Sequence, residues 1–204
     1  MTEREKMLAG MIYDPSDDEL QNLRTTAHNL CYAYNKLNED DEARGEILKK
    51  LLPNGNGAYL QGPVYFDYGL FTTFGKNCYA NFNLTVLDCC PVTIGDNVFI
   101  GTGVSIVTPV HPLLPAERNM YAKGSVMTDK EYAKPIVIGS NCWIASNVTI
   151  CGGVTVGRGC VIGAGSVVTR DIPSGVFAAG NPCRVIRKIT EKDSIYLKRN
   201  LWED

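Results

Sequence analysis

The stretch IVIGSNCWIASNVTICGGVTVGRGCVIGAGSVVT, residues 136–169, places an aliphatic residue at every sixth position. These positions are Ile138, Ile144, Ile150, Val156, Ile162 and Val168. An α-helix repeats every 3.6 residues and a β-strand every two, so a sustained period of six belongs to neither alone. It suits a coil whose turns each contain three short flat strands, with six residues for one strand and its corner. The stretch therefore predicts a parallel β-helix, of which the hexapeptide repeat is a sequence signature.

A second set of positions, also six residues apart, supports this prediction. The set consists of Cys142, Val148, Val154, Cys160 and Ser166. The segment VTIGDNVFIGTGVSI, residues 92–106, repeats both registers, and a weaker copy runs through Phe74 and Val86. Small residues follow most of the aliphatic ones, where we expect tight corners; they are Gly139, Ala145, Gly157 and Gly163.

The first 55 residues have a different, helical pattern. Thr2-x-x-Glu5 and Ser16-x-x-Glu19 both read as capping boxes that open helices. After Ser16, apolar residues at helical spacing form one stripe: Leu20, Leu23, Ala27, Leu30, Cys31 and Tyr34. A third helical piece, ARGEILKKLL, ends at Pro53. We predict a helical module over residues 1–55, a β-helix over 56–186 and a tail over 187–204.

Between the two regular blocks the period fails. Residues 108–135, TPVHPLLPAERNMYAKGSVMTDKEYAKP, contain three prolines before Pro135 and no hexad. A long loop inside a regular coil is usually functional or disordered. This one carries His, Arg, Glu and Lys side chains, so it is the first place to look for a site.

Composition narrows the class of protein. The formal net charge of −2 gives no general attraction to nucleic acid or to an anionic membrane. The first residues, MTEREKMLAGMIYDP, are charged and lack the apolar run of a signal peptide, and no segment is long enough to span a bilayer. We therefore expect a cytoplasmic protein. Its eight cysteines include no CxxC pair, and in that compartment packed free thiols are favoured over disulfides or a metal site.

Six ordered motifs carry a resemblance to a known family. They are YANFN (79–83), IGDN (94–97), PVHP (109–112), EYAKPIVIG (131–139), NCWIASN (141–147) and GNPCRVIRKI (180–189). Together they resemble the maltose and galactoside O-acetyltransferases, and KMLAG followed by YDP resembles the helical start of that family. These enzymes belong to the hexapeptide-repeat acyltransferases, which fold as left-handed β-helices. The resemblance covers nearly the whole chain.

The resemblance implies properties that the period alone does not. It implies a left-handed coil, against the general preference for right-handed crossovers. It also implies a homotrimer with active sites between subunits, acetyl-CoA as the donor, and a sugar hydroxyl of the maltose, glucose or galactoside type as the acceptor. No metal is implied.

The chemistry of such a transfer requires a base for the hydroxyl proton, a donor for the oxyanion, and positioning. Histidine suits the first role, because its unperturbed pKa lies near neutrality, and the chain has only two. His28 falls in a helix and reads as an ordinary helical residue. His111 lies in the aperiodic loop and matches the catalytic histidine of the family, so we expect direct transfer with His111 as general base.

Other site residues follow from the resemblance. Asn81, with Asn83 nearby, is expected at a coil edge that meets His111 of a neighbour, where Asn81 orients substrate and stabilises the transition state. Asp67 and Asp88 match sugar-contacting positions, but the match at the second is ambiguous, because the chain reads Asp88-Cys89. If Cys89 is the counterpart, a carboxylate is missing. Further acceptor candidates are Asp14, Asp17, Arg24 and Glu131, the last as a support or contact of His111.

The coenzyme positions implied by the resemblance lie in the later part of the coil. They are Trp143, Ser146, Ala164, Thr169, Arg170, Arg184 and Arg187. The 18 residues between Ser146 and Ala164 make one turn and keep both on one edge. The arginines, with Lys188, form a basic end suited to nucleotide phosphates.

Three alternatives can be compared with this interpretation. A zinc carbonic anhydrase on the same fold needs three histidine ligands, which a chain with two histidines cannot supply. An acetyltransferase for another hydroxyl acceptor, such as serine, an antibiotic or an amino sugar, stays open. A non-catalytic β-helix scaffold also stays open, although the presence of both His111 and Asn81 argues against it.

Overall fold

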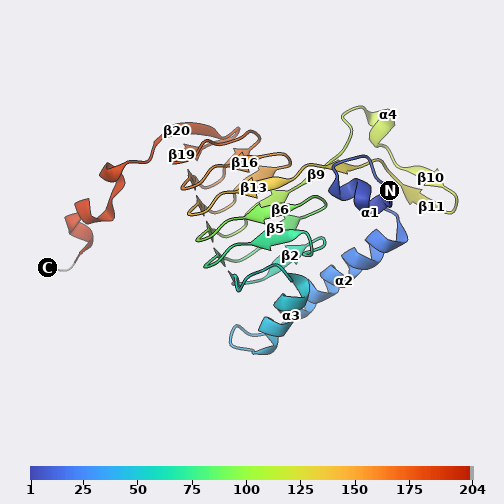
Figure 1. Ribbon diagram of the computed structural model, residues 1–204, viewed down its shortest axis with the longest axis horizontal. Helices are drawn as coiled ribbons and strands as arrows, with labels where there is room; N and C mark the ends of the chain where they lie inside the picture. Colours follow the sequence, from blue (N-terminus) through green and yellow to red (C-terminus); the bar gives the residue numbers. More distant parts are fainter. Residues whose placement is uncertain (203–204) are drawn as a thin grey trace.

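The computed structural model describes residues 1–202, and its central feature is the β-helix that the repeat predicts (Figure 1). Three sheets run along the coil, and their strands are parallel except for β20, which pairs antiparallel with β19. The chain passes through the three sheets in the same order in every turn. We call the passage from the seven-stranded to the five-stranded sheet the first corner. The passage on to the four-stranded sheet is the second corner, and the return is the third. The predicted class, a mainly β, left-handed parallel β-helix with helices at its start, is confirmed.

The strands are short, mostly two or three residues each. The seven-stranded sheet contains β1 (Tyr59–Leu60), β4 (Tyr79–Ala80), β7 (Phe99–Ile100), β14 (Trp143–Ile144), β17 (Val161–Ile162), β19 (Val176–Ala179) and β20 (Arg184–Lys188). The five-stranded sheet contains β2 (Val64–Phe66), β5 (Leu84–Leu87), β8 (Ser105–Val107), β15 (Thr149–Cys151) and β18 (Val167–Val168). The four-stranded sheet contains β3 (Thr72–Phe74), β6 (Val92–Ile94), β13 (Ile136–Ile138) and β16 (Thr155–Val156).

The interior of the coil consists of apolar side chains stacked in register on successive turns. Ile144 pairs with Ile100 on the turn before it and with Ile162 on the turn after it. All six aliphatic positions of the 136–169 repeat are buried, with at most 1% of each residue exposed. Full burial of such a side chain contributes about 1.5–3 kcal/mol, so the stacked hexads are the main source of the coil's stability.

The corners are tight, as predicted, but the freedom of glycine to adopt a left-handed backbone does not explain the small residue that follows each aliphatic one. Gly139 has no left-handed backbone; instead, a Cβ there would lie 2.6 Å from the backbone nitrogen of Arg158 on the next turn. The left-handed positions at this third corner belong to Asn77, Asn97 and Asn141 on the earlier turns, with φ of 58°, 55° and 63°, and to Gly159 and Gly175 on the later turns, with φ of 67° and 71°. Asparagine tolerates that conformation better than other residues with a Cβ. The small residues that follow the aliphatic ones therefore mark where two turns approach closely, and asparagines or glycines two positions further on mark where the chain bends.

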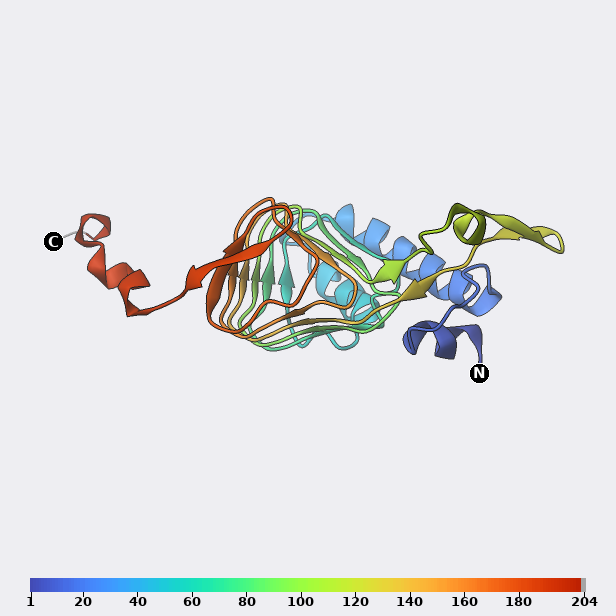
Figure 2. The same cartoon turned by 90° about the horizontal axis from the view of Figure 1, so that it is seen from above.

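The loop of residues 108–135 leaves the coil at the second corner and has structure of its own. Its elements are β9 (Pro109–Val110), α4 (Pro115–Arg118), β10 (Tyr121–Lys123), β11 (Val126–Thr128) and β12 (Tyr132–Ala133). β10 and β11 form an antiparallel hairpin, and β9 pairs antiparallel with β12. Seen along the coil, the hairpin projects beyond it, beside the N-terminal helices (Figure 2).

Three helices precede the coil: α1 (Glu3–Leu8), α2 (Asp18–Asn35) and α3 (Ala43–Leu51). The capping box predicted at Thr2 is present. The one predicted at Ser16 is wrong, because Asp17 is the N-cap of α2 and accepts hydrogen bonds from the backbone of Glu19 and Leu20. The predicted apolar stripe of α2 faces inward, with Leu20, Ala27, Cys31 and Tyr34 buried.

The cysteines are free thiols, as predicted, and seven of the eight are buried. The chain ends in three short 3₁₀ turns: η1 (Glu191–Asp193), η2 (Ile195–Leu197) and η3 (Arg199–Leu201). They extend away from the coil on the side opposite the hairpin (Figures 1 and 2). The last two residues of the predicted tail, 203–204, lie outside the described residues. Within residues 1–202, no helix has the length and apolar character needed to cross a bilayer.

Candidate functional site

The two ends of the loop meet next to the second corner. The ladder between β9 and β12 pairs Val110 with Tyr132 and Pro109 with Ala133. His111 comes directly after β9, and Glu131 comes directly before β12. Residues separated by most of the loop are therefore neighbours in space.

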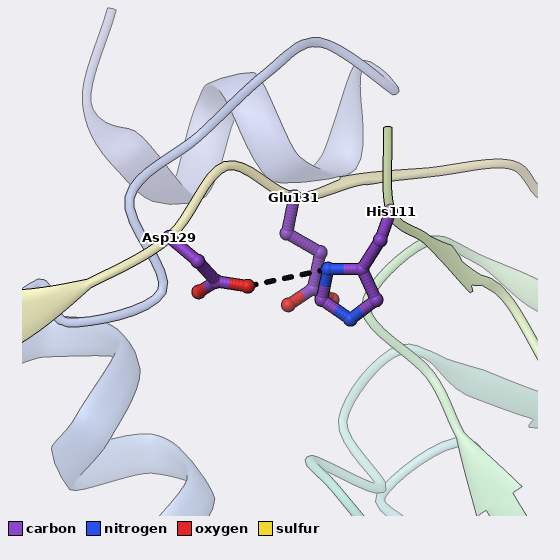
Figure 3. Close-up of side chains that lie close together, drawn as sticks. All are labelled: His111, Asp129 and Glu131. Atoms are coloured by element: carbon purple, nitrogen blue, oxygen red, sulfur yellow. Dashed lines mark ion pairs between the residues drawn. The ribbon is translucent and has the colours of Figure 1, made fainter. Parts of the chain in front are cut away.

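His111 lies in a cluster with two carboxylates, Asp129 and Glu131 (Figure 3). Its Nδ1 is 3.2 Å from Oδ2 of Asp129. Ligand atoms of the three side chains all lie within 4.8 Å of one another. The other ring nitrogen, Nε2, lies on the side of the ring away from Asp129 (Figure 3). A cation could be held by these three groups, but the direct contact is a histidine–carboxylate pair of the kind used in proton transfer.

Glu131 is fixed by the N-terminal segment. Tyr13 Oη donates a hydrogen bond of 2.8 Å to Oε1 of Glu131, and the Tyr13 backbone N–H donates to the Glu131 carbonyl at 3.0 Å. Burial raises the pKa of the Glu131 carboxyl above its ordinary value. Burial, with the nearby Cys89 and Glu131, also raises the pKa of Tyr13. Tyr13 therefore stays a neutral hydroxyl that donates to Glu131.

Asp67 lies at the second corner and extends the polar cluster. Its Oδ1 is 3.5 Å from Nε2 of His28, and its Oδ2 accepts a long contact of 3.7 Å from the thiol of Cys89. With His28, Tyr32 and Tyr65, it lines a cavity of about 460 Å³ between α2 and the five-stranded sheet. The structure thus places Asp67 where its carboxylate can meet a polar ligand, and it shows His28 beside it, which the helical pattern did not indicate.

Asp88 does not face the site, so its assignment as a sugar contact is wrong. Its side chain is fully buried. Oδ1 accepts hydrogen bonds from the backbone of Tyr68 and Gly69, and Oδ2 accepts from Phe71 and the Thr72 hydroxyl. The carboxylate is therefore used to close the turn between β2 and β3. The position that faces Asp67 and Tyr13 is the next one, Cys89, so a thiol stands where a carboxylate was expected.

Asp14 has its carboxylate oxygens occupied. Oδ1 accepts from Ser16 and Thr128, and Oδ2 pairs with Nζ of Lys123 at 2.5 Å. Although burial opposes it, hydrogen bonds from Lys123, Ser16 and Thr128 hold the pKa of Asp14 well below its ordinary value. Rather than facing a sugar, as expected, Asp14 ties the hairpin to the N-terminal segment.

Asp17 and Arg24, the other two acceptor candidates near the N-terminus, also have structural partners. Asp17 caps α2. Arg24 donates to the Tyr68 hydroxyl at 3.0 Å and to the Pro15 carbonyl at 3.2 Å. The structure does not bring Asp17 or Arg24 into hydrogen-bond contact with His111.

The two asparagines of YANFN have different roles. Asn83 adopts a left-handed backbone, φ 61°, at the first corner, so it is a corner residue. Asn81 follows β4, and its side-chain oxygen accepts from the backbone N–H of Phe82 at 2.7 Å. The side-chain nitrogen of Asn81 has no hydrogen-bond partner within residues 1–202. That amide group can donate to a substrate oxygen.

His111 and Asn81 lie on opposite edges of the five-stranded sheet. Asn81 is at the first corner, before β5, and the loop of His111 leaves at the second corner, after β8. A strand of three or four residues separates the two edges by about 10–13 Å. One chain therefore does not bring both side chains to one substrate atom.

The coenzyme candidates in the coil divide between the same two edges. Ser146 and Ala164 lie on successive turns at the first corner, and the Gly165 N–H donates to the Ser146 carbonyl at 2.9 Å. Thr169 and Arg170 are exposed at the second corner, after β18. Trp143, half-exposed, lies on the outer face of the seven-stranded sheet.

Arg184 and Arg187 come from β20, where the register matters. Their spacing of three would place them on opposite faces of a regular strand. A register shift in the pairing with β19 sets Arg187 opposite Phe177 and Arg184 opposite Ala179, both on the outward face. Arg187 also pairs with Asp193 at 2.6 Å, and this pair lowers the pKa of Asp193 to about 2.

Sequence reasoning missed Asp129 and Tyr13, and it left open whether Asp88 or Cys89 faces the site. One signal was available for Asp129, because it precedes Glu131 by two positions, and residues two apart on an extended chain share a face. Nothing in the pattern identified Tyr13, which reaches Glu131 across 118 positions of sequence.

Models of known families match three parts of the chain. Residues 6–55 match the maltose acetyltransferase hexapeptide capping motif. Residues 135–170 match the bacterial transferase hexapeptide of six repeats, and residues 91–111 match the hexapeptide repeat of succinyl-transferase.

Relatives and solved structures resemble the whole chain. The galactoside O-acetyltransferase of Escherichia coli is 41% identical over 198 residues, covering 96% of this chain and 93% of its own. The crystal structure of a maltose O-acetyltransferase from Clostridium difficile is 41% identical, with a TM-score of 0.86, and covers 94% of this chain and 99% of its own. A galactoside acetyltransferase in complex with coenzyme A is 40% identical, with a TM-score of 0.85, and covers 95% and 94%.

Proposed function

Because this chain belongs to the family of hexapeptide-repeat acetyltransferases, we propose that it transfers the acetyl group of acetyl-CoA to a hydroxyl of a sugar. The acceptor is of the maltose, glucose or galactoside type, as the names of its relatives suggest. The observation that carries the proposal is the placement of His111 in a loop cluster with two carboxylates beside the second corner. A carboxylate beside an imidazole is an arrangement that suits a general base.

The reaction is a direct transfer with His111 as the base. Nε2 of His111 removes the proton from the acceptor hydroxyl as its oxygen attacks the thioester carbonyl carbon. The carbon–sulfur bond then breaks, and the coenzyme A thiolate takes the proton from the imidazolium. Asn81 donates a hydrogen bond to the oxyanion, a role for which its unpartnered amide nitrogen suits it.

The separation of His111 from Asn81 supports a site shared by two copies of the chain. The first corner of one copy would carry Asn81 to the second corner of its neighbour. Such an interface joins two different surfaces, so it closes only as a ring. A coil with three long sides supports a ring of three, and the oligomer we propose is a homotrimer.

The order of the residues along both edges agrees with such an interface. At the first corner, Asn81 lies on an early turn and Ser146 on a later one. At the second corner, Asp67 and the His111 loop lie on early turns and Thr169 on a later one. If the first corner of one copy faces the second corner of the next, the sugar would therefore lie at the early turns and coenzyme A along the later ones.

The donor site would use the later turns and β20. Pantetheine is a narrow chain with amides, so it can lie between the two edges against the small residues Ser146 and Ala164. Arg170, Arg184 and Arg187 are exposed near that end of the coil and can bind the nucleotide phosphates.

The acceptor site would use Asp67, and the Glu131 oxygen that does not accept from Tyr13, as hydrogen-bond acceptors for sugar hydroxyls. Because Asp88 is buried and Cys89 takes its place at the site, the sugar loses one carboxylate contact. We therefore expect the chain's preference among sugars to differ from that of a relative with an aspartate there.

A panel of acceptors tests the proposal. Thiol release from acetyl-CoA is followed with maltose, glucose and galactosides, and with serine, an amino sugar and a chloramphenicol-like alcohol, and products are identified by mass. We expect release that depends on a sugar hydroxyl and a His111→Ala variant that lacks it. Release with serine or the antibiotic alone would identify another acetyltransferase, and no release with any acceptor would favour a scaffold. Light scattering that gives a fully active monomer would contradict the trimer.

A further inference from the structure

We propose that Asp129 is the residue that positions His111 for catalysis. It holds the hydrogen of the neutral imidazole on Nδ1 and so leaves the lone pair on Nε2. The inference rests on the proposed role of His111 as general base. Its geometric basis is the distance of 3.2 Å between His111 Nδ1 and Asp129 Oδ2 (Figure 3).

The chemistry of the two groups determines the tautomer. An ionised carboxylate can only accept hydrogen bonds. A hydrogen on the ring nitrogen that lies 3.2 Å from the carboxylate is therefore favoured, and in the neutral ring the other nitrogen then has the free lone pair. A half-exposed imidazole without such a partner exchanges between both tautomers and turns about its side-chain bonds. Asp129 limits both motions.

Glu131 is the competing candidate, because it lies opposite His111 in the continued β9–β12 register. Its carboxylate, however, already accepts the hydrogen bond of the Tyr13 hydroxyl at 2.8 Å. Burial also raises its pKa, which makes it less readily ionised than an ordinary glutamate. Glu131 is therefore the support of the loop end, and Asp129 is the direct partner of His111.

The backbone around Asp129 is held on both sides by the N-terminal segment. Thr128, which is 2% exposed, donates its hydroxyl to Asp14 at 2.5 Å. Glu131 is held by Tyr13 through both backbone and side chain. Two adjacent residues, Tyr13 and Asp14, thus fix the chain immediately before and shortly after Asp129. The carboxylate meets the imidazole in a preformed position rather than from a free loop tip.

During the reaction Asp129 would have a second effect. When Nε2 takes the hydroxyl proton, the ring becomes a cation, and the carboxylate at Nδ1 stabilises it without taking the proton itself. Losing Asp129 should therefore slow turnover but not abolish it. We expect a decrease of about 10- to 100-fold, below the full contribution of a general base.

Nuclear magnetic resonance of histidine labelled with nitrogen-15 tests the tautomer directly. The chain has only two histidines, so His28→Ala assigns both sets of signals. Two-bond correlations of the ring nitrogens should show His111 as the Nδ1–H tautomer in the wild-type protein. In Asp129→Ala the signals should move toward a mixture of tautomers. Lys130→Ala, a change at the exposed adjacent position, is the matched control and should leave them unchanged.

Kinetics complete the test. Asp129→Ala and the isosteric Asp129→Asn should lower kcat, while the KM for acetyl-CoA stays within about twofold of wild type. An unchanged His111 tautomer in Asp129→Ala, or an Nε2–H tautomer in the wild-type protein, would overturn the proposal. So would a changed tautomer with unchanged kcat. The proposed function fails by a different result, namely a His111→Ala variant that keeps its rate with sugar.

Discussion

Residues 136–169 and residues 108–135 adjoin in the sequence but are held in opposite ways. In the coil, apolar side chains such as Ile144 and Ile162 stack on their counterparts one turn away and are fully buried. In the loop, the strands of the hairpin are mostly exposed, and polar contacts of Asp14 and Tyr13 hold it in place. The coil supplies stability and straight edges, whereas the loop carries His111, the proposed general base. Substitutions in the two regions should therefore separate stability from activity.

The largest expected effect is that of His111→Ala on turnover. We expect kcat to fall by about 10²- to 10⁴-fold, the usual contribution of a general base. The melting temperature and the oligomeric state should stay as in wild type, because the side chain lies outside the stacked interior. Steady-state kinetics and light scattering provide the two measurements. His28→Ala is the control and is measured with saturating sugar, because His28 lies 3.5 Å from Asp67. It should keep most of its kcat, and equal kcat of the two variants would refute the assignment of the base.

For Ile144→Ala in the coil we expect a large loss of stability and little loss of activity. Removing a fully buried isoleucine should reduce the free energy of unfolding by about 2–5 kcal/mol. The protein that remains folded should keep a kcat near that of wild type, because Ile144 is fully buried in the interior of the coil. Denaturant unfolding measures the first quantity. Thr93→Ala, on the outer face of the four-stranded sheet, is the control, and an equal loss in both variants would contradict the stacking argument.

A smaller and local effect is expected for Asp14→Asn. Removing the charge weakens the contacts with Lys123 and Thr128, so amides of β10 and β11 should exchange about tenfold faster with solvent. Amides of the coil should exchange as before.

The same tether has a predicted pH dependence. The pKa of Asp14 is lowered in the folded chain, so its contribution is complete above the ordinary aspartate range and is lost as the pH falls through the lowered value. Hydrogen exchange followed by mass spectrometry, corrected for intrinsic rates, should show acid-induced loosening of the hairpin in wild type but not in Asp14→Asn. Loosening of the coil and the hairpin together would show that the loop is not held separately.

An effect of about the same size concerns the basic end of the coil. Changing Arg184 and Arg187 together to Ala should raise the KM for acetyl-CoA about tenfold, since exposed charge contacts contribute up to about 1 kcal/mol each. The KM for sugar should change little. Arg158→Ala, at the third corner, is the control for loss of positive charge. A change confined to the KM for sugar would show that these arginines act on the sugar and not on acetyl-CoA.

The same contrast explains what could be predicted from the sequence. The coil was predictable because each interior position recurs after six residues and again after one turn, so the pattern is local. Asp88 and Cys89 could not be separated, because at a corner the direction of a side chain depends on the turn, not on the period. Ser16 and Asp17 are both good caps, and only the backbone decides between them. The pairing of Asp129 with His111 depends on the β9–β12 ladder, and no periodic pattern in the sequence predicts that ladder.

The central claim is that acetyl transfer takes place between two chains, with His111 from one and Asn81 from the next. Each of the variants His111→Ala and Asn81→Ala should be nearly inactive alone, with a loss of about 100-fold or more. They can be unfolded, mixed in equal amounts and refolded together. In a ring of random composition, one facing pair in four then has both wild-type residues, so the mixture should recover roughly one quarter of wild-type activity. If both residues acted within one chain, the mixture would recover none, and this result would contradict the shared site.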